Sequence, residues 1–217
     1  MASSVVPGPA GRRQERRAQR QDLGRAQLLD AAEEVFGRQG YREATLREVA
    51  ELAEFSVGSV YSFFDNKDDL FRQIFLRRGQ EFGPALRAAL DPETGTPLDQ
   101  LHRLIDVEVG FLRDHPHFGR VYLRYASAGP LSVDRAIDER VAANYAEWLD
   151  LQADLFARGQ ASGHFRDGDP RVLAQLLTGL VAAYQALDPA VVSDEADPGE
   201  RFPLAELHVV VERAFRG

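Results

Sequence analysis

Residues 45–67, TLREVAELAEFSVGSVYSFFDNK, decide how this chain folds. The stretch opens with a capping box, because the Thr45 hydroxyl can accept a hydrogen bond from the backbone N–H of Glu48 while the Glu48 carboxylate reaches back to Thr45. Apolar side chains then recur at the spacing of one helix face; they are Leu46, Val49, Ala50 and Ala53. We therefore expect a short helix in the first part of the stretch.

A second short helix is expected directly after the first. Ser56 has the position of its N-cap, and Val60 and Phe64 fall on its inward face. Lys67 then opens a third helix. The N-terminal end of a helix dipole disfavours a cation, so a phosphate partner would explain why a lysine occupies this position. The alternative is local pairing with the nearby acids Asp65, Asp68 and Asp69. Two short helices with a tight link are typical of a helix-turn-helix.

The pattern of these residues resembles the DNA-binding domain of the TetR family of bacterial transcriptional regulators. The resemblance covers about residues 22–75 and rests on Thr45, Val49-Ala50, Phe55-Ser56, Gly58-Ser59-Val60-Tyr61, Phe64, Lys67 and Leu70. It implies an all-α protein with an N-terminal three-helix helix-turn-helix domain over residues 22–75. A C-terminal helical domain for effector binding and dimerisation would follow over residues 76–217. It also implies a regulator rather than an enzyme.

Residues 1–21 combine small residues and prolines with five arginines and a single acid. We expect a disordered basic arm there, becoming helical near its end. Basic arms of this kind can follow DNA phosphates or enter a minor groove, and the alternative is a solvated tail.

The resemblance places DNA contacts on and beside the two short helices. Val57 and Ser59 are the candidates for base edges, and Gly58 permits close approach of the backbone to a groove. Each candidate also has a structural reason to be present, since hydroxyls cap helices, a tyrosine can be core and a glycine is tolerated at a helix start. The full predicted set, weighted toward phosphate contacts, is Thr45, Arg47, Ser56, Val57, Gly58, Ser59, Tyr61 and Lys67.

Two residues depart from the family pattern. Glu54 stands where the turn usually has glycine, so we expect either a strained left-handed backbone or a slightly different turn. Phe63 stands where histidine or tyrosine commonly contacts phosphate. We expect that contact to be missing or replaced by packing.

Charge is unevenly distributed along the chain. Its 217 residues have a formal net charge of −8, yet residues 1–78 carry 13 basic and 12 acidic side chains while residues 79–217 carry 13 and 22. An acidic body joined to a near-neutral domain with a basic tip is compatible with DNA binding.

Cysteine is absent, which excludes disulfides and thiolate metal sites and fits the cytoplasm. Because no run of about 18 apolar residues occurs, we expect no membrane partner.

The second half of the chain is expected to be helical throughout. Prolines at helix starts and glycine or Asp-Pro separators predict helices over residues 98–114, 116–128, 133–162, 170–187 and 203–215. The last two are unusually apolar. They could be interior helices of one subunit, whereas the resemblance implies a homodimer in which two copies form a four-helix bundle. The predicted interface residues are Leu173, Leu176, Leu177, Leu180, Leu207, Val210 and Val211.

Neither a catalytic nor a cofactor motif is present, since phosphate-loop, nucleophile-elbow and zinc-helix signatures are all missing. His115 and His117 could ligate a metal with Glu108 or Asp114, but solvated imidazoles at a loop-to-helix junction are favoured because metal sites need three or four ligands. Aromatic side chains on the middle helices could line a pocket for a small, largely apolar effector, with an ordinary aromatic core as the alternative. The predicted effector-binding residues are Phe111, Tyr122, Tyr125, Tyr145, Trp148 and Tyr184.

Together these features predict a ligand-responsive repressor that binds a pseudo-palindromic operator on double-stranded DNA as a homodimer. A small-molecule effector would release it. The alternatives are a regulator that needs no ligand, and a helical small-molecule-binding protein or enzyme without DNA binding.

Overall fold

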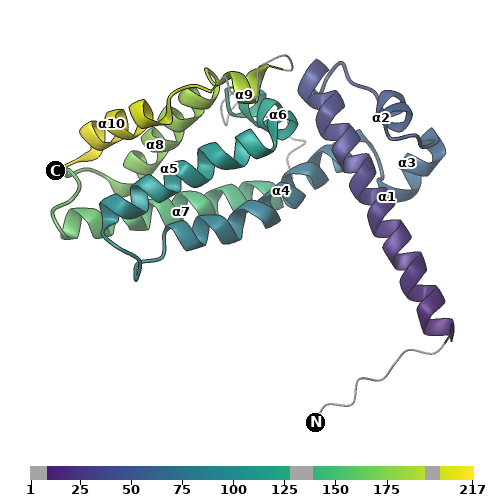
Figure 1. The fold of residues 1–217 in the computed structure, drawn as a ribbon, viewed down its shortest axis with the longest axis horizontal. Helices are drawn as coiled ribbons and strands as arrows, with labels where there is room; N and C mark the ends of the chain where they lie inside the picture. Colours follow the sequence, from purple (N-terminus) through teal and green to yellow (C-terminus); the bar gives the residue numbers. More distant parts are fainter. Residues whose placement is uncertain (1–8, 128–138, 194–200) are drawn as a thin grey trace, which may run out of the picture.

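A computed structural model of the chain describes residues 9–127, 139–193 and 201–217. Within these ranges it contains ten helices and no strand, apart from an isolated bridge between Phe165 and Arg216. The helices are α1 (Pro9–Gln39), α2 (Leu46–Leu52), α3 (Val57–Phe63), α4 (Lys67–Ala89), α5 (Pro97–Asp114), α6 (Pro116–Ser127), α7 (Glu139–Ala161), α8 (Pro170–Gln185), α9 (Pro189–Val192) and α10 (Leu204–Phe215) (Figure 1). The predicted all-α fold is confirmed.

Helices α1 to α4 surround the first of two hydrophobic cores. Its members on these four helices with no exposed surface are Leu28, Ala32, Val49, Val60, Leu70 and Ile74. They recur at the spacing of one helix face on α1, α2 and α4, as the periodicity predicts. This core fixes the two short helices α2 and α3 against the longer scaffold of α1 and α4.

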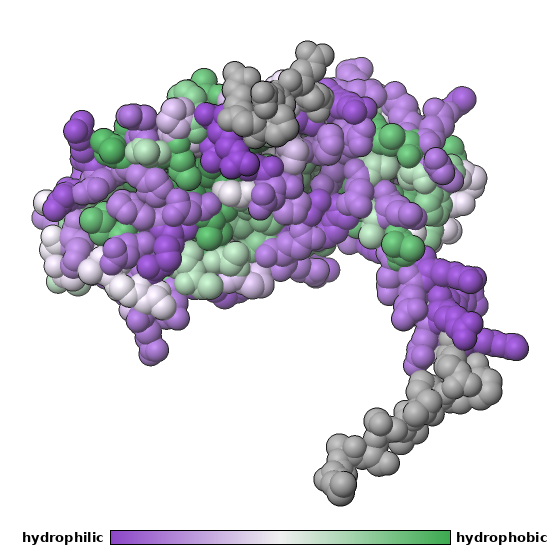
Figure 2. Space-filling model, in the orientation of Figure 1, coloured by the Kyte–Doolittle hydropathy of each residue, from purple (hydrophilic) through white to green (hydrophobic). Residues whose placement is uncertain are grey.

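Helix α1 is longer than the sequence analysis expects. The composition of residues 1–21 predicts a disordered arm that becomes helical only near its end, whereas α1 begins at Pro9 and its first part projects away from the rest of the molecule (Figure 1). This projection has a hydrophilic surface (Figure 2), and Arg13, Arg16, Arg17 and Arg20 on it are exposed. The arginines alternate with alanine, glutamine and glutamate, which are good helix formers. Residues 1–8 of the predicted arm lie outside the described residues.

The second hydrophobic core lies between the end of α4 and helices α5, α7, α8 and α10. Its members with no exposed surface include Leu104, Ile105, Leu155, Phe156, Leu177 and Val211. The predicted helix boundaries in this half agree with the structure within about two residues, except that the predicted start at residue 133 lies outside the described residues. The short helix α9 was not predicted. None of the described helices is both long and apolar enough to cross a membrane.

Two features join the halves of the molecule. Helix α4 runs from the first core into the second, and α1 packs directly against α6. The packing of α1 on α6 is close at Gly37, where a Cβ atom would lie 2.8 Å from the backbone oxygen of His117. A side chain at this position would push the two helices apart, so glycine permits the contact.

Candidate nucleic-acid interface and internal cavity

Local signals build the link between α2 and α3. The predicted capping box is present, with the Glu48 N–H donating to Thr45 Oγ1 at 3.2 Å and the Thr45 N–H donating to Glu48 Oε2 at 2.8 Å. Ser56 caps α3 by accepting from the Ser59 N–H at 3.0 Å. Glu54 has φ of 59°, the one positive φ of a non-glycine residue in the described ranges. The expected left-handed backbone at Glu54 is therefore confirmed, and it costs about 1 kcal/mol relative to glycine.

The outward side of α3 does not pack into the hydrophobic core of the chain. Val57 is 37% exposed and Tyr61 is 57% exposed, so Tyr61 is not a core aromatic. A Cβ atom at Gly58 would meet nothing closer than Ser56 Oγ at 3.8 Å, so packing inside the chain does not require a glycine there. The hydroxyls of Ser56 and Ser59 are hydrogen bonded to each other at 2.8 Å. This small-residue surface is open to an outside partner.

Lys67, the single lysine of the chain, opens α4 close to this surface. Its ammonium donates to the Arg42 carbonyl at 3.1 Å and lies 4.5 Å from the centre of the Tyr41 ring. Burial lowers the pKa of Lys67, and the charges of Glu43 and Glu48 partly oppose that shift. An ammonium has three donors, so Lys67 can still donate to a phosphate.

The other charged side chains near Lys67 have partners of their own. Asp68 accepts from the Tyr41 hydroxyl and Asp69 pairs with Arg72, so the alternative of local pairing between Lys67 and these two acids is not observed. On α2, Arg47 pairs with Glu51 at 2.8 Å, and its side chain is 80% exposed. An ion pair this exposed contributes little to stability, which leaves the guanidinium available for DNA.

Phe63 packs instead of presenting a polar group. Its ring lies 6.3 Å from that of Phe55 in an edge-to-face arrangement, and a Cβ atom at Gly24 would come 3.2 Å from it. Arg25 donates to the Phe63 carbonyl at 3.1 Å and places its guanidinium 4.6 Å from the centre of the Phe64 ring. The expectation that packing replaces a phosphate contact at Phe63 agrees with this arrangement.

A cavity of about 650 Å³ lies in the helical body between α4, α5, α6, α7 and α8. Four of the six predicted effector-binding residues line it together: Phe111, Tyr122, Tyr145 and Trp148. Tyr184 does not, because it is buried in the second core, where it accepts from Arg113 at 2.9 Å and donates to the Phe202 carbonyl. The side chain of Tyr125 lies outside the described residues. The other aromatic residues of the lining are Phe75, Phe82 and Phe118.

Glu108 is the one acidic side chain among the described residues that line the cavity. Its carboxylate accepts from Gln152 Nε2 at 2.9 Å, and the Gln152 carbonyl in turn accepts from the Thr178 hydroxyl at 3.4 Å. Burial raises the pKa of Glu108 to about 8, against the hydrogen bond from Gln152, which lowers it. Burial and the neighbouring Glu108 also raise the pKa of Tyr145.

The polar residues of the cavity are not among the predicted effector-binding residues, and Glu108 is predicted only as a possible metal ligand. A signal was available, because Glu108 interrupts an apolar stripe of α5 made by Leu101, Leu104, Ile105 and Leu112. A charged residue in a buried stripe needs a partner or a function. His115, by contrast, stacks on Phe111 with ring centres 4.6 Å apart. The described residues contain no cluster of three or more metal-ligating side chains.

Comparison with known proteins agrees with this architecture. The family described as "Bacterial regulatory proteins, tetR family" matches residues 28–74, the part that contains α2, α3 and the start of α4. The chain belongs to the TetR family. It is therefore a DNA-binding transcriptional regulator with a helix-turn-helix domain.

Relatives of this TetR-family chain support the assignment over most of its length. Over 158 residues it is 27% identical to the uncharacterized HTH-type transcriptional regulator YhgD of Bacillus subtilis, covering 72% of this chain and 79% of that protein. A TetR-like transcriptional regulator from Rhodococcus sp. RHA1 is 26% identical with a TM-score of 0.66, over 88% of this chain and 94% of the other. The ketosteroid transcriptional regulator KstR2 of Mycobacterium tuberculosis has the same fold, with a TM-score of 0.68, 18% identity and coverage of 89% and 95%.

Helix α8 of this TetR-family regulator presents three faces. The first packs into the second core through Leu173, Leu177, Val181 and Tyr184. The second lines the cavity with residues spaced at i, i+4, i+7, i+11 and i+14: Arg171, Gln175, Thr178, Ala182 and Gln185. The third is an apolar outer face on which Val172 and Leu176 are 49% and 54% exposed. No atom lies within 4 Å of a Cβ built on Gly179, which lies between the second and third faces.

The structure divides the predicted dimer interface into two groups. Leu173, Leu177, Leu207 and Val211 are buried in the core of their own chain, so they are not surface contacts for a second copy. Leu176 and Val210 are 54% and 49% exposed, and Leu180 is partly buried. Val172, one helical turn before Leu176 on α8, and Val209, next to Val210 on α10, are also exposed. The apolar outer surface of α8 and α10 therefore consists of Val172, Leu176, Leu180, Val209 and Val210.

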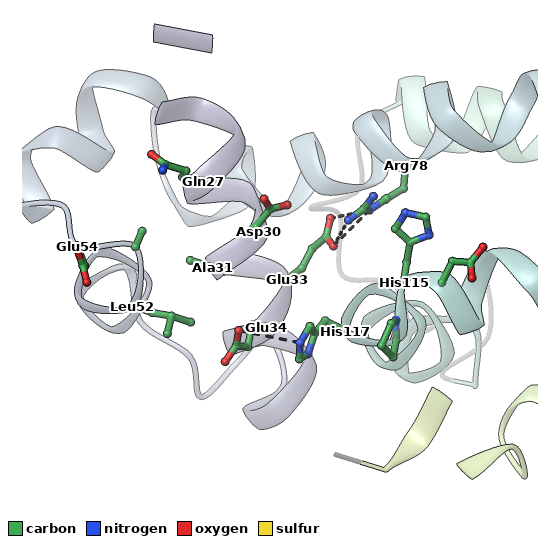
Figure 3. A pocket seen from close by; sticks show the side chains of 13 residues that line it. Gln27, Asp30, Ala31, Glu33, Glu34, Leu52, Glu54, Arg78, His115 and His117 are labelled. Carbon is green, nitrogen blue, oxygen red and sulfur yellow. Dashed lines mark hydrogen bonds and ion pairs between the residues drawn. The ribbon is translucent and has the colours of Figure 1, made fainter. Parts of the chain in front are cut away.

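A buried ion-pair cluster connects the DNA-binding domain with α4. Glu33 on α1 is only 3% exposed and pairs with Arg77 Nη2 at 2.5 Å and with Arg78 Nη2 at 2.7 Å. Figure 3 shows Arg78 reaching Glu33 at a pocket of about 510 Å³ between α1, α2 and the α5–α6 junction. Arg78 lines this pocket and also the internal cavity. It therefore touches both the DNA-binding domain and the candidate effector space.

Proposed function

We propose that this regulator is a cytoplasmic repressor, that it binds a pseudo-palindromic operator as a homodimer, and that a small, largely apolar effector in the cavity releases it. The observation that supports this most is the course of α4. The helix begins at Lys67 beside α3, and further along it Arg78 and Phe82 line the cavity. One continuous element thus joins the DNA-facing residues to the ligand space.

On the DNA side, phosphate contacts would position the domain and a few side chains would read bases. Tyr61 suits a phosphate because it is exposed, and Lys67 does because its ammonium has donors beyond the one that the Arg42 carbonyl accepts. The capped starts of α2 and α3 add backbone N–H groups. Val57 can contact a thymine methyl, and Ser59 can reach a base or a phosphate. Arg47 is the longest candidate for a guanine. Base reading from α3 would therefore be sparse.

The homodimer would form through the apolar outer surface of α8 and α10. Two copies of this helix pair can pack as a four-helix bundle, and Gly179 permits close approach of the helices. In such a dimer the two α3 helices would enter successive major grooves about 34 to 36 Å apart. Exposed apolar patches of this kind on a water-facing helix pair mark interaction surfaces.

The effector would act by favouring a dimer whose two reading helices are differently spaced. Its cavity is lined by α8 directly beside the outer face of that helix, and by Arg78, which holds Glu33 on α1. A ligand that binds better to one arrangement of these helices shifts the population toward it. Release from DNA follows when the favoured arrangement does not fit two half-sites.

Removing the two strongest phosphate candidates is expected to weaken DNA binding. We expect Lys67→Ala to reduce the slope of log affinity against log salt concentration by about one, because one phosphate neutralisation is lost. The Tyr61→Ala, Lys67→Ala double variant should lose affinity more than either single variant. Binding to the promoter of the protein's own or adjacent gene, measured over a range of salt concentrations, tests both expectations.

The matched control is Arg166→Ala, which removes an exposed cation beside the end of α10, at the end of the molecule away from α3 (Figure 1). It should leave the salt slope unchanged. Lys67 offers a second readout, since it and the N-terminal amine are the primary amines of the chain. Operator DNA should protect Lys67 from acetylation. Unchanged affinity of the double variant would reject the contact assignment.

A charge on the outer face of α8 is expected to break the homodimer. In a symmetric interface Leu176→Glu acts twice, and a hot-spot contact is worth about 2 kcal/mol per copy, so dimer affinity should fall roughly 1,000-fold. Light scattering should show the mass falling from twice 24.1 kDa toward 24.1 kDa. The control is Leu23→Glu on the projecting part of α1, where Leu23 is 61% exposed. A Leu176→Glu variant that remains dimeric would place the interface elsewhere.

A further inference from the structure

The cavity combines apolar walls with one partly buried carboxyl group, that of Glu108. Glu108 reaches it from α5, and the described residues give its carboxylate a single donor, the neutral amide of Gln152 at 2.9 Å. The ion pairs of the two arginines that line the cavity, Arg78 and Arg171, are with acids other than Glu108. A carboxylate removed from water without a counter-charge is costly, so this position favours an external cation or a proton.

The two arginines of the lining do not supply that counter-charge. Arg78 is engaged by Glu33, at 3.0 Å from its Nε and 2.7 Å from its Nη2, and by Glu81 at 2.6 Å from its Nη1. Arg171 pairs with Asp150, and the side chains of this pair are 51% and 61% exposed. Both guanidinium groups are already neutralised by acids outside the cavity. Glu108 therefore provides the unpaired charge in the described lining.

Aromatic rings surround the same space from four helices. Phe82 on α4 packs edge-to-face against Trp148 on α7, with ring centres 5.2 Å apart, and lies 5.0 Å from Phe111 on α5. Tyr122 on α6 and Tyr145 on α7 complete the wall. The faces of such rings carry negative partial charge and attract organic cations, most strongly when water is excluded. Burial of the apolar part of a ligand against these rings adds a hydrophobic contribution.

We propose that the effector of this regulator is an amphipathic organic cation, an amine or quaternary ammonium on an apolar body, whose charge lies between Glu108 and the aromatic wall. The proposal rests on the function proposed above and adds the charge of the ligand to it. Gln152 would orient the carboxylate, and Tyr145 would place its ring beside the same charge. A cavity of about 650 Å³ is large enough for a drug-sized molecule of this kind.

Two other classes of ligand, neutral and anionic, would respond differently to the loss of the Glu108 charge. A neutral ligand with a carbonyl group could accept a hydrogen bond from the protonated Glu108, and a glutamine at this position would still donate. An anionic ligand would be repelled by ionised Glu108 and would bind better once the charge is removed. The charge of the ligand is therefore read from how its affinity responds to Glu108→Gln.

The experiment uses three probes of matched length: 4-phenylbutyltrimethylammonium, 5-phenylpentan-1-ol and 5-phenylpentanoate. Trp148 is the single tryptophan of the chain and lines the cavity, so its fluorescence reports occupancy directly. At pH 8 we expect saturable binding of the ammonium probe, weakened at least tenfold in Glu108→Gln. The alcohol should bind both proteins within about twofold, and the carboxylate should bind the variant more tightly.

The charge-matched control is Glu147→Gln. Glu147 lies on α7 beside the cavity, but it is exposed and pairs with Arg87 at 2.5 Å outside it. This variant should bind the ammonium probe like the unchanged protein. Equal melting temperatures of the unchanged protein and Glu108→Gln at pH 5 would exclude a folding defect. No saturable binding of the ammonium probe, or an equal loss for the ammonium and the alcohol, would overturn the proposal.

Release of operator DNA separates this inference from the function on which it rests. Ammonium binding that depends on Glu108 but leaves the operator complex intact would support the charge assignment and reject the proposed effector response. Release of DNA by the alcohol, together with no binding of the ammonium probe, would support the proposed effector response and reject the charge assignment. Release by the ammonium probe that is lost in Glu108→Gln and kept in Glu147→Gln would support both.

Discussion

Replacing Glu33 with glutamine is expected to lower the free energy of unfolding by about 3 to 5 kcal/mol, the range for removing one partner of a buried ion pair. The amide keeps the shape of the side chain but not its charge. Arg77 and Arg78, whose side chains are 19% and 12% exposed, would then lose the carboxylate that both of them bind. Their remaining partners, Asp30 and Glu81, are 64% and 44% exposed, so solvent screens these two ion pairs.

Thermal and urea unfolding at a fixed protein concentration measure this loss, because dimer stability depends on concentration. The melting temperature should fall by roughly 6 to 20 °C. Glu34→Gln is the matched control on the same helix, since Glu34 is 26% exposed and pairs with the exposed Arg38. That variant should cost less than about 1 kcal/mol. Similar losses for the two variants would show that the Glu33 cluster is not a buried ion pair in solution.

The same variant tests whether the cluster transmits the effector signal. Arg78 loses its ion pair with α1 in Glu33→Gln while it still lines the cavity. We therefore expect Trp148 fluorescence to report nearly unchanged ligand binding. The amount of DNA released at saturating ligand should fall, because the ligand would no longer bias α1 through Arg78.

Local signals allowed the helix-turn-helix to be predicted from the sequence almost residue by residue. The Thr45 capping box and the Ser56 cap depend on groups three residues apart, so the tertiary fold is not needed to recognise them. The turn pattern at Glu54 leaves two alternatives, a left-handed backbone or a different turn, and the structure has the left-handed backbone. The basic composition of the projecting start of α1 predicts a disordered arm, although its residues are also good helix formers.

The surfaces of α8 and α10 could not be assigned from composition alone. Both helices are apolar on more than one side, and a change of one position along a helix turns a side chain by about 100°. Leu177 faces the core of its own chain whereas Leu176 faces outward, and Val211 and Val210 divide in the same way. Only the packing of α5, α7 and α8 against one another decides which side is covered.

The cavity was predicted in part for a similar reason. Aromatic residues on α5, α6 and α7 suggested a pocket, and Phe111, Tyr122, Tyr145 and Trp148 do line one. Tyr184 lies on the core face of α8. The spacing of residues along α8 does not show which of its faces packs against the other helices. Glu108 stood out in a buried stripe, but its role depends on Gln152 from α7, 44 residues away.

Glu108→Gln is expected to become more stable than the unchanged protein as the pH rises, by roughly 3 to 5 kcal/mol at pH 9. Burial raises the pKa of Glu108 to about 8 in the folded protein from an ordinary value of 4.5. Folding therefore favours the protonated carboxyl. The stability that this preference contributes is complete below pH 4.5 and is lost as the pH rises through 8, since the unfolded chain ionises freely. Glutamine does not ionise and avoids the loss.

The groups around Glu108 do not contribute to the pH dependence of this stability difference. Tyr145 from α7 has a pKa raised above its ordinary value of 10.0, which is outside this pH range. The arginines and histidines are common to both proteins, so their contributions cancel in the difference between the two unfolding free energies. Gln152 and Thr178 do not titrate. A growing difference between about pH 5 and 9 therefore reports Glu108 itself.

Urea unfolding of the two proteins at pH 5, 7 and 9 measures that difference directly. A permanently charged ammonium probe provides an independent measurement, because it can bind ionised Glu108 only after the carboxyl has released its proton. Its affinity for the unchanged protein should rise about tenfold per pH unit between roughly pH 6 and 8 and then level off. Its affinity for Glu108→Gln should not change over this range. A stability difference that is constant with pH would mean that Glu108 is well solvated, and that the cavity does not hold a buried carboxyl group for a cation to meet.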